Sequence, residues 1–262
     1  MRRILVTGAN KGIGLAIAFR LLEEWSDTAV VVGSRDRGRG EAALQQLLAR
    51  LGWQYKNRVE LLQLDVTSDA SVEAAVGSLR ALYGERCLYG LINNAGGSCE
   101  AARDTVELNC RAARRVTEAL LPLLQPSGRV VMISSGAAPG FVSKCSRDKQ
   151  EFMLDPNITW SELEQSVIAP FLRICEDSAL DETGRKVALS RAGLGESAYG
   201  LSKACMNSYT IELARRLPNL DVNACSPGFI ATDLTLSFTK GRDPTTVGAK
   251  PVEAGTVAPI FL

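Results

Sequence analysis

The chain of 262 residues contains no histidine, and this absence excludes several classes of enzyme site. A Ser-His-Asp triad or a Cys-His pair cannot be built without histidine, and neither can a zinc site with imidazole ligands. Any proton transfer must therefore use a tyrosine, a lysine, a carboxyl group, a cysteine or water. We expect no metal site.

Long apolar runs and an excess of one charge are also absent. No apolar stretch approaches the roughly 18 residues that a membrane-spanning helix needs. The apolar run 4–7 is too short for a signal peptide, so we expect a protein that is not exported. With 30 basic and 29 acidic side chains, the net charge of +1 predicts neither nucleic acid nor a membrane surface as a partner.

The seven cysteines include no Cys-x-x-Cys pair. An odd number of cysteines without an export signal indicates reduced thiols, and we therefore expect a cytoplasmic protein. Most of these thiols should be buried as small apolar groups. Cys99 and Cys145 lie among polar residues and are expected to be more exposed.

The sequence does contain a regular alternation of apolar strands and helices. Strands are expected at 4–7, 29–34, 59–64, 88–92, 129–135 and 220–225, and helices at 15–22, 41–51, 69–83, 104–124 and from 199 onward. This rhythm predicts an α/β fold in which helices cover both faces of a parallel sheet. Ligands of such a sheet bind at the carboxyl ends of its strands.

A glycine-rich turn separates the first expected strand from the first expected helix. The turn consists of Gly8, Ala9, Asn10, Lys11, Gly12, Ile13 and Gly14. Its glycines permit a tight turn and a close approach of backbone N–H groups to a pyrophosphate at the helix N-terminus. The turn therefore predicts a dinucleotide site, with a plain structural turn as the alternative.

The end of the second strand bears on the choice of dinucleotide. In such folds an acidic side chain at this point binds the 2′-OH of the adenosine ribose, whereas an arginine accommodates a 2′-phosphate. Arg35 directly follows the strand, and Lys11 lies in the glycine-rich turn, so the sequence favours NADP(H). Two alternatives stay open: Asp36 could accept from the ribose, or the arginines could form only a solvated loop.

Two residues on the helix from 199 onward carry the expected chemistry. Tyr199 and Lys203 are four residues apart and share a helix face, where a nearby ammonium favours ionisation of the phenol. Such a pair could act as an acid-base catalyst, although it also occurs as an ordinary helix pair. Asp65, the segment 93–97 and Ser135 fall at the same predicted edge of the sheet.

The long segment between Ser135 and Tyr199 predicts an insertion in a single domain spanning 1–262. Thr159 and Glu162 form an expected capping box, and an apolar stripe at helical spacing follows. The polar stretches 147–150 and 177–186 are expected to be loops. We interpret residues 140–192 as a helical lid or flank of the active site.

The motifs taken together resemble the short-chain dehydrogenase/reductases. They are Thr7-Gly8-x-x-x-Gly12-x-Gly14, Asn93-Asn94-Ala95-Gly96, Asn109, Ser135, Tyr199-x-x-x-Lys203 and Pro227-Gly228. The glycine-rich turn, the residues 34–36 and the insertion are most similar to the monomeric, NADPH-dependent carbonyl reductases. The resemblance covers nearly the whole chain and implies a doubly wound Rossmann-type sheet with the strand order 3-2-1-4-5-6.

The resemblance also implies a role for each residue of the site. Tyr199 would donate a proton to the substrate carbonyl, and Lys203 would lower the pKa of the phenol and bind the nicotinamide ribose. Ser135 would hold the carbonyl oxygen, with Ser134 as the less favoured alternative because it faces the other way. Asn109 would fix a water in the proton relay. The implied NADPH contacts also include Gly8, Asn10, Lys11, Gly12, Ile13, Gly14, Arg35, Asp65, Val66, Asn93, Ala95, Gly96, Pro227, Gly228, Ile230 and Thr232.

The sequence departs from the carbonyl reductases in two places. The stretch 97–104 is shorter, which reshapes one wall of the substrate cleft, and the chain stops where relatives continue to a seventh strand. Because the insertion would cover the helix that pairs subunits in other family members, we expect a monomer. The alternatives to a carbonyl reductase are an alcohol dehydrogenase working oxidatively, a catalytically silent NADP(H)-binding regulator and, less well supported, a methyltransferase.

Overall fold

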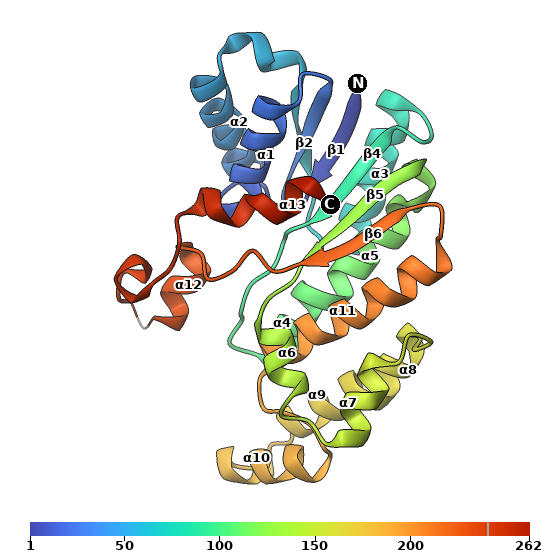
Figure 1. Ribbon diagram of the computed structural model, residues 1–262, viewed down its shortest axis with the longest axis vertical. Helices are drawn as coiled ribbons and strands as arrows, with labels where there is room; N and C mark the ends of the chain where they lie inside the picture. The colour runs from blue at the N-terminus through green and yellow to red at the C-terminus, as the bar shows by residue number, and fades with distance from the viewer. Residues whose placement is uncertain (240) are drawn as a thin grey trace.

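The computed structural model of the chain describes residues 1–239 and 241–262. Within these residues, six parallel strands form one sheet in the order β3-β2-β1-β4-β5-β6 (Figure 1). The strands are β1 (Arg2–Val6), β2 (Thr28–Ser34), β3 (Val59–Gln63), β4 (Leu88–Asn93), β5 (Leu124–Ile133) and β6 (Asp221–Cys225). The predicted fold class and strand order are confirmed.

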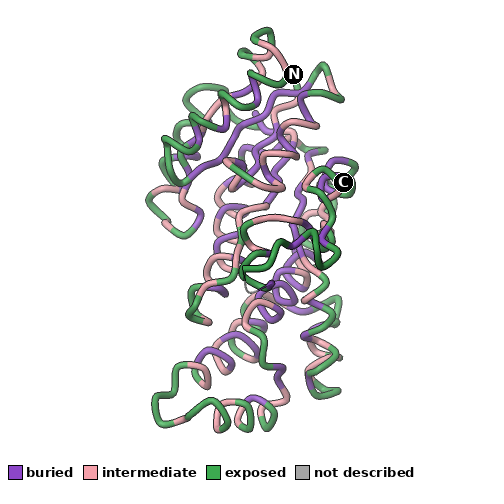
Figure 2. The backbone as a smooth tube through the Cα atoms, turned by 90° about the vertical axis from the view of Figure 1, so that its left-hand side faces the viewer, coloured by how far each residue is buried: buried purple, intermediate pink, exposed green. Residues whose placement is uncertain are grey.

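The central strands are buried, as expected for a parallel sheet with helices on both faces. Every residue of β2 is buried, and so are Leu5 and Val6 of β1. In Figure 2 the buried stretches run through the strands, with exposed loops around them. At the edge of the sheet, the residues of β6 are exposed or half-buried. Burial on both faces explains why continuous apolar runs, rather than alternating patterns, marked the inner strands in the sequence.

Helices form a layer on each face of the sheet (Figure 1). One layer contains α1 (Gly12–Glu24), α2 (Arg37–Leu51) and α13 (Val257–Phe261), and the other contains α3 (Asp69–Tyr83), α5 (Ala112–Leu120) and α11 (Ala198–Arg216). In the first layer, Ile17 and Leu47 join a core cluster with Val6. In the second layer, Leu79 and Val116 join a separate cluster with Leu5. The sheet thus separates two apolar cores.

Three predicted helices have other boundaries in the structure. Helix α1 runs from Gly12 to Glu24 rather than over 15–22. Helix α2 begins at Arg37 rather than at residue 41, because the Asp36 carboxylate caps it by accepting a hydrogen bond from the Arg39 backbone N–H at 2.8 Å. The predicted helix 104–124 is divided into α4 (Ala102–Val106), a π-helical turn η2 (Glu107–Arg111), α5 and a 3₁₀ turn η3 (Leu121–Leu123). Pro122 lies in η3, and the chain then enters β5 at Leu124.

The insertion between β5 and α11 is helical over most of its length. It contains α6 (Ala137–Val142), α7 (Arg147–Leu154), α8 (Trp160–Leu163), the π-helical turn η4 (Glu164–Ile168), α9 (Ala169–Cys175) and α10 (Glu182–Arg191). The predicted capping box of Thr159 and Glu162 is confirmed at α8. The loops predicted at 147–150 and 177–186 are wrong for α7 and α10, which Ser146 and Asp181 cap at their N-termini.

The insertion builds a third apolar cluster with α11. The rings of Phe141 and Phe171 meet edge to face with centroids 6.3 Å apart. Leu201 and Cys205 of α11 belong to the same cluster. Cys145 is buried in it, so the expectation that this thiol is exposed is wrong. Figure 1 shows α7 to α10 together below α11.

The segment after β6 crosses back toward the glycine-rich turn. It forms α12 (Asp233–Phe238), the 3₁₀ turns η5 (Pro244–Val247) and η6 (Val252–Thr256), and then α13. The turn η6 thus leads directly into α13. A further 3₁₀ turn, η1 (Trp53–Asn57), precedes β3. In the described part of the chain, no helix has both the length and the apolar character that crossing a membrane requires.

Candidate functional site

A cleft of about 730 Å³ lies at the carboxyl ends of the strands. The predicted site residues that line it are Gly8, Asn10, Lys11, Gly12, Ile13, Arg35, Asp65, Val66, Ala95, Gly96, Tyr199, Lys203, Pro227 and Thr232. Residues from the turn after β1, the ends of β2 and β3, and helix α11 are therefore brought together. This agreement between distant segments marks the cleft as the candidate site.

Some predicted residues do not line the cleft. Gly14 and Asn109 lie directly behind lining residues, as described below. Ser135 is not among the lining residues, whereas Ser134, the less favoured alternative, is. Asn93 is buried and donates from Nδ2 to the Thr117 hydroxyl at 2.9 Å, so its side chain points into the helix layer. Gly228 and Ile230 are also not among the lining residues. A side-chain contact of Asn93 or Ile230 with a ligand in the cleft is therefore not supported.

The glycine-rich turn is packed closely against the end of β4. Gly8 has a φ of +63°, and a Cβ there would lie 2.9 Å from the Ala95 Cα. A Cβ on Gly14 would lie 2.8 Å from the Gly8 carbonyl oxygen and closer still to the Asn94 side chain. No larger residue fits either position without moving the backbone.

Thr7 and Asn94 hold this turn in place, and sequence reasoning gave neither a role at the site. The Thr7 hydroxyl accepts from the backbone N–H groups of Asn94 and Ala95 at 3.0 and 2.9 Å. The Asn94 amide donates to the carbonyl oxygens of Thr7 and Gly8 at 2.9 and 3.3 Å. Thr7 opens the glycine motif and Asn94 belongs to the Asn-Asn-Ala-Gly motif, and this was the signal available in the sequence.

Positive charge gathers at the β2 end of the cleft. Arg35 and Arg39 both line it, and neither guanidinium forms an ion pair with any other described residue. The Asp36 carboxylate also lines the cleft, but its Oδ1 is used in capping α2. Arg39 was not predicted at the site from the sequence, because α2 was expected to begin at residue 41, which puts Arg39 in a loop. This end of the cleft is therefore suited to a phosphate group.

Tyr199 and Ser135 meet at the other end of the cleft. The Ser197 hydroxyl caps α11 by accepting from the Gly200 backbone N–H at 3.0 Å, which puts Tyr199 in the first turn. Burial raises the pKa of Tyr199, and a hydrogen bond with the Ser135 side chain opposes this rise. The neighbouring hydroxyl of Ser134 points instead to Asn207 at 2.6 Å.

Lys203 lies one helical turn after Tyr199 and is only 4% exposed. Its ammonium donates to the Ile133 carbonyl oxygen at 2.7 Å and lies 5.9 Å from the centroid of the Tyr199 ring. Burial lowers the pKa of Lys203 to about 8. The expectation that Lys203 lowers the pKa of Tyr199 is not met in this arrangement, because the burial of the phenol outweighs any such effect and raises its pKa.

Asn109 is fully buried in the π-helical turn η2 and ties three segments together. Its Oδ1 accepts from the Gly97 backbone N–H at 2.9 Å, and its Nδ2 lies within hydrogen-bond distance of the Gly97 carbonyl oxygen and the Ser202 hydroxyl, at 2.7 and 3.1 Å. A Cβ on Gly96 would lie 2.6 Å from the Asn109 Oδ1 and 3.4 Å from the Lys203 Nζ. Asn109 Oδ1 and Lys203 Nζ thus both lie close behind Gly96.

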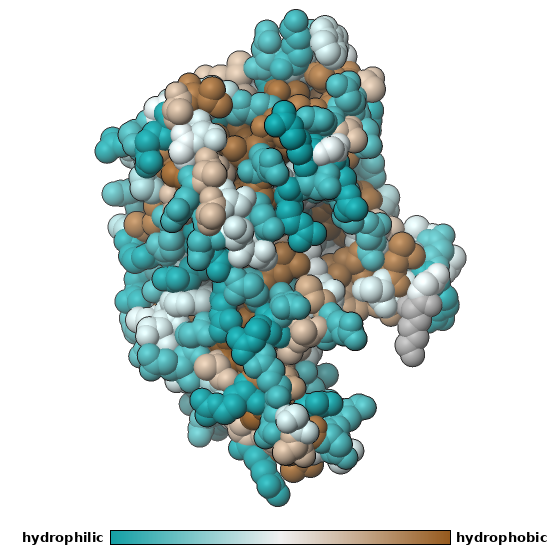
Figure 3. Space-filling view, turned by 180° about the vertical axis from the view of Figure 1, so that it is seen from behind, coloured by the Kyte–Doolittle hydropathy of each residue, from teal (hydrophilic) through white to brown (hydrophobic). Residues whose placement is uncertain are grey.

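Helix α12 forms the outer wall near Tyr199. The Phe238 ring lies with its centroid 5.7 Å from that of Tyr199. Phe229, Leu236 and Phe238 are large apolar side chains that remain exposed on this segment. Figure 3 shows the segment standing out from the body of the molecule, with apolar side chains in the notch beside it. This wall offers apolar surface to a ligand close to the Tyr199 ring.

The described residues contain no group of three or more Cys, Asp or Glu side chains that could hold a metal ion. The chemistry of the cleft therefore has to be argued from its hydroxyl, amine and guanidinium groups and from any organic cofactor that it binds.

Comparisons with known proteins agree with this geometry. Residues 2–145 match the family model described as short chain dehydrogenase. The chain is 34% identical over 277 residues to carbonyl reductase (NADPH) 3 of Rattus norvegicus, covering 100% of this chain and 90% of the relative. The solved structure of salutaridine reductase from Papaver somniferum matches with a TM-score of 0.80 at 25% identity, covering 100% of this chain and 96% of that one. Menthone neomenthol reductase from Mentha piperita matches with a TM-score of 0.74 at 28% identity, covering 98% and 94%.

Proposed function

The chain belongs to the short-chain dehydrogenase/reductase family, and from this membership we propose that it is an NADPH-dependent carbonyl reductase acting on ketones, aldehydes or quinones. One observation carries the proposal: the half-buried Tyr199 lines one end of a cleft together with the buried Lys203 one helical turn later, and the other end of the cleft is glycine-lined and basic. The relative named above as an NADPH carbonyl reductase supports the same reading.

The cleft fits NADPH on several counts. Gly8 and Gly12 line the cleft without side chains, so the backbone of the turn is open to a pyrophosphate at the N-terminus of α1. Arg35 and Arg39 supply the positive charge that a 2′-phosphate needs, while Asp65 and Val66 line the adenine end. Bound there, NADPH supplies the hydride that reduces the carbonyl carbon.

Tyr199 is the proton donor in this proposal. Because burial raises its pKa, the phenol keeps its proton at neutral pH and can give it to a carbonyl oxygen. The Ser135 hydroxyl lies beside it and donates a hydrogen bond to the same oxygen as negative charge develops there. The apolar wall formed by Phe238 favours substrates that carry an apolar group next to the carbonyl.

Lys203 and Asn109 support the proton transfer. With a pKa of about 8, Lys203 exchanges protons near physiological pH and can replace the proton that Tyr199 loses. The Asn109 side chain is already occupied by hydrogen bonds to protein groups. That Asn109 fixes a water of the proton relay, as the resemblance implies, stays a prediction.

We also propose that the protein acts as a monomer with one catalytic domain. The insertion packs Phe141 against the face of α11 that carries Gly200 and Leu201, and so covers a surface that could otherwise pair subunits. The seven free cysteines suit a reducing compartment, and we propose the cytoplasm. Light scattering tests the monomer, and a stable tetramer would contradict it.

The experiment that tests the function is NADPH oxidation with a panel of ketones, aldehydes and quinones, using wild type and Tyr199→Phe. Loss of the phenol should reduce kcat by at least about 100-fold, the lower end of what a general acid contributes, while the Kd for NADPH changes less than about twofold. Tyr55→Phe, which changes a tyrosine outside the cleft, is the matched control. NADPH binding without turnover of any carbonyl would favour a regulatory protein instead.

A further inference from the structure

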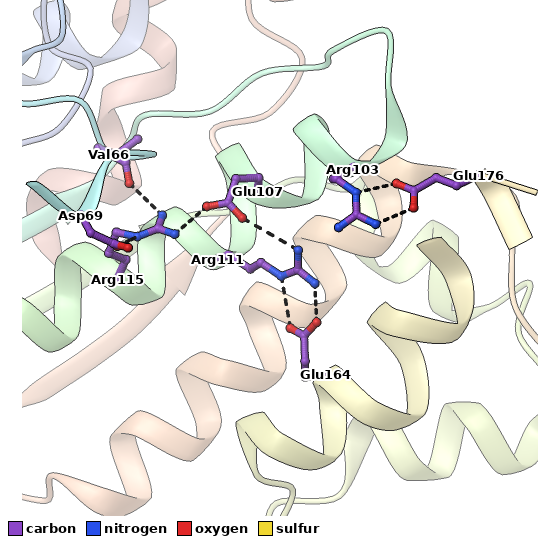
Figure 4. A network of polar contacts seen from close by, with 8 residues as sticks. All are labelled: Val66, Asp69, Arg103, Glu107, Arg111, Arg115, Glu164 and Glu176. Carbon is purple, nitrogen blue, oxygen red and sulfur yellow. Dashed lines mark hydrogen bonds and ion pairs between the residues drawn. The ribbon is translucent and has the colours of Figure 1, made fainter. Parts of the chain in front are cut away.

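A chain of ion pairs joins the cofactor cleft to the insertion (Figure 4). Arg115 donates to the Val66 carbonyl oxygen at 3.1 Å and pairs with Glu107 at 2.7 Å. Glu107 lies 3.8 Å from Arg111, and Arg111 holds both carboxylate oxygens of Glu164. Val66 lines the cleft and Glu164 begins η4, so the chain spans the full distance between them.

The members of this ion-pair chain are partly shielded from solvent. The side chains of Arg111 and Glu164 are 23% and 30% exposed, whereas those of the nearby pair Arg103 and Glu176 are 54% and 41% exposed. Both pairs are bidentate, with two guanidinium nitrogens facing two carboxylate oxygens. Partial burial reduces the screening by water, so the Arg111–Glu164 pair should be the more effective tie.

The position of the chain matters because Glu107 and Arg111 are the first and last residues of η2. Between them lies Asn109, whose amide is hydrogen-bonded to Gly97 and Ser202 and lies close to Gly96, as Lys203 Nζ also does. A π-helical turn is less favourable than an α-helical one and persists where its surroundings hold it. At one end of η2, Glu107 pairs with Arg115, which is bound to Val66 in the β3–α3 loop. At the other end, Arg111 pairs with Glu164 of the insertion.

We propose that Arg111 is a positioning residue, which keeps the π-helical turn and Asn109 in the geometry that the proton relay needs by tying η2 to Glu164 of the insertion. The inference rests on the proposed function. By this inference the insertion contributes to catalysis as well as covering α11, because its Glu164 carboxylate holds η2 in place through Arg111. Arg103 and Glu176 tie α4 to the end of α9 without touching η2.

The test compares Arg111→Met and Glu164→Gln with the matched controls Arg103→Met and Glu176→Gln. Loss of the Arg111–Glu164 pair should lower kcat by about tenfold, counted per NADPH-binding site, with the Kd for NADPH changed less than about twofold. Counting per binding site separates mispositioning from partial unfolding, since unfolding lowers the number of sites. Arg111→Lys keeps the charge but loses the two-point contact, and its kcat should fall between those of wild type and Arg111→Met.

A second readout does not depend on activity. Amide hydrogen exchange should become faster in residues 105–112 of Arg111→Met and Glu164→Gln, and should stay as in wild type there in the two controls. Equal kcat losses in the controls, or unchanged exchange in residues 105–112, would overturn the inference. If wild type itself reduces no carbonyl, the proposed function fails, whereas the exchange result still decides whether Glu164 holds η2.

Discussion

The ammonium of Lys11 lies 2.6 Å from the carboxylate of Asp233, so an ion pair connects the glycine-rich turn to the start of α12. Both residues line the cleft. The contact holds the pKa of Asp233 below its usual value. A negative charge therefore faces the region where an anionic cofactor would bind, and it occupies the lysine that the sequence assigned to a phosphate.

Replacing Asp233 by Asn should tighten NADPH binding. The change removes a like charge and frees Lys11 for the cofactor, and the expected decrease in Kd is about threefold, within the range of an exposed ion pair. Fluorescence titration at low and high salt measures it, and the difference should shrink at high salt. Glu253→Gln removes an exposed charge that does not line the cleft, and its Kd should match wild type. Equal effects in the two variants would contradict this role of Asp233.

Replacing Arg35 by Ala should weaken NADPH binding more than NADH binding. The Arg35 guanidinium lines the cleft without an ion-pair partner among the described residues, and a 2′-phosphate is present only in NADPH. We expect the ratio of the two Kd values to change by at least about tenfold, as for a charge-assisted contact. Arg37→Ala is the control, because Arg37 pairs with Glu41 and does not line the cleft. Equal losses for both cofactors would remove the argument for a 2′-phosphate.

The parts of the structure that the sequence predicted well depend on local patterns. Helix α3 begins at Asp69 and ends at Tyr83 as expected, because Ser68 caps it and Gly84 ends it. The glycine-rich turn could be predicted because its tight backbone requires glycine at positions such as Gly8 and Gly14. The carboxyl ends of parallel strands lie at one edge of the sheet, so the fold class alone predicted that the residues lining the cleft would lie close together.

The parts that the sequence did not predict depend on contacts between distant segments. Lys11 and Asp233 are 222 residues apart, and no local pattern relates them. The π-helical turn at Asn109 has the composition of an ordinary helix, and its identity follows from what surrounds it. The direction of the Tyr199 pKa shift was missed for a similar reason, because burial by residues such as Phe238 is not visible in the spacing of Tyr199 and Lys203.

Replacing Gly96 by Ala should impair catalysis. The new Cβ would lie 2.6 Å from the Asn109 Oδ1, and this amide cannot move without losing its bonds to Gly97 and Ser202. We expect a stability loss of about 1–3 kcal/mol, typical of overpacking, and a fall in kcat of more than about tenfold. Thermal unfolding and NADPH oxidation measure the two effects. Gly77→Ala, in α3 with no atom within 4 Å of the new Cβ, should be neutral or stabilising. Wild-type kcat in Gly96→Ala would show that the contact is not critical.

Lys203 should make the stability of the protein depend on pH. Burial lowers its pKa from 10.5 in an exposed lysine to about 8, so between these values the unfolded chain binds more protons than the folded one. Stability must then rise with pH across this window, because the cost of the buried charge is complete below about pH 8 and is relieved above it. The difference in pKa corresponds to a cost on the order of 3 kcal/mol.

The variant Lys203→Met removes this cost. It should therefore be more stable than wild type at about pH 7, and its advantage should shrink as the pH rises toward about 10. Urea unfolding at a series of pH values measures the difference in the free energy of unfolding. The control is Lys186→Met, since Lys186 is exposed and pairs with Glu182, and its difference from wild type should stay flat over the same range. An advantage of Lys203→Met that is constant or grows with pH would mean that Lys203 is not a proton-binding group whose burial favours the neutral amine, and its part in the proton relay would then have to be abandoned.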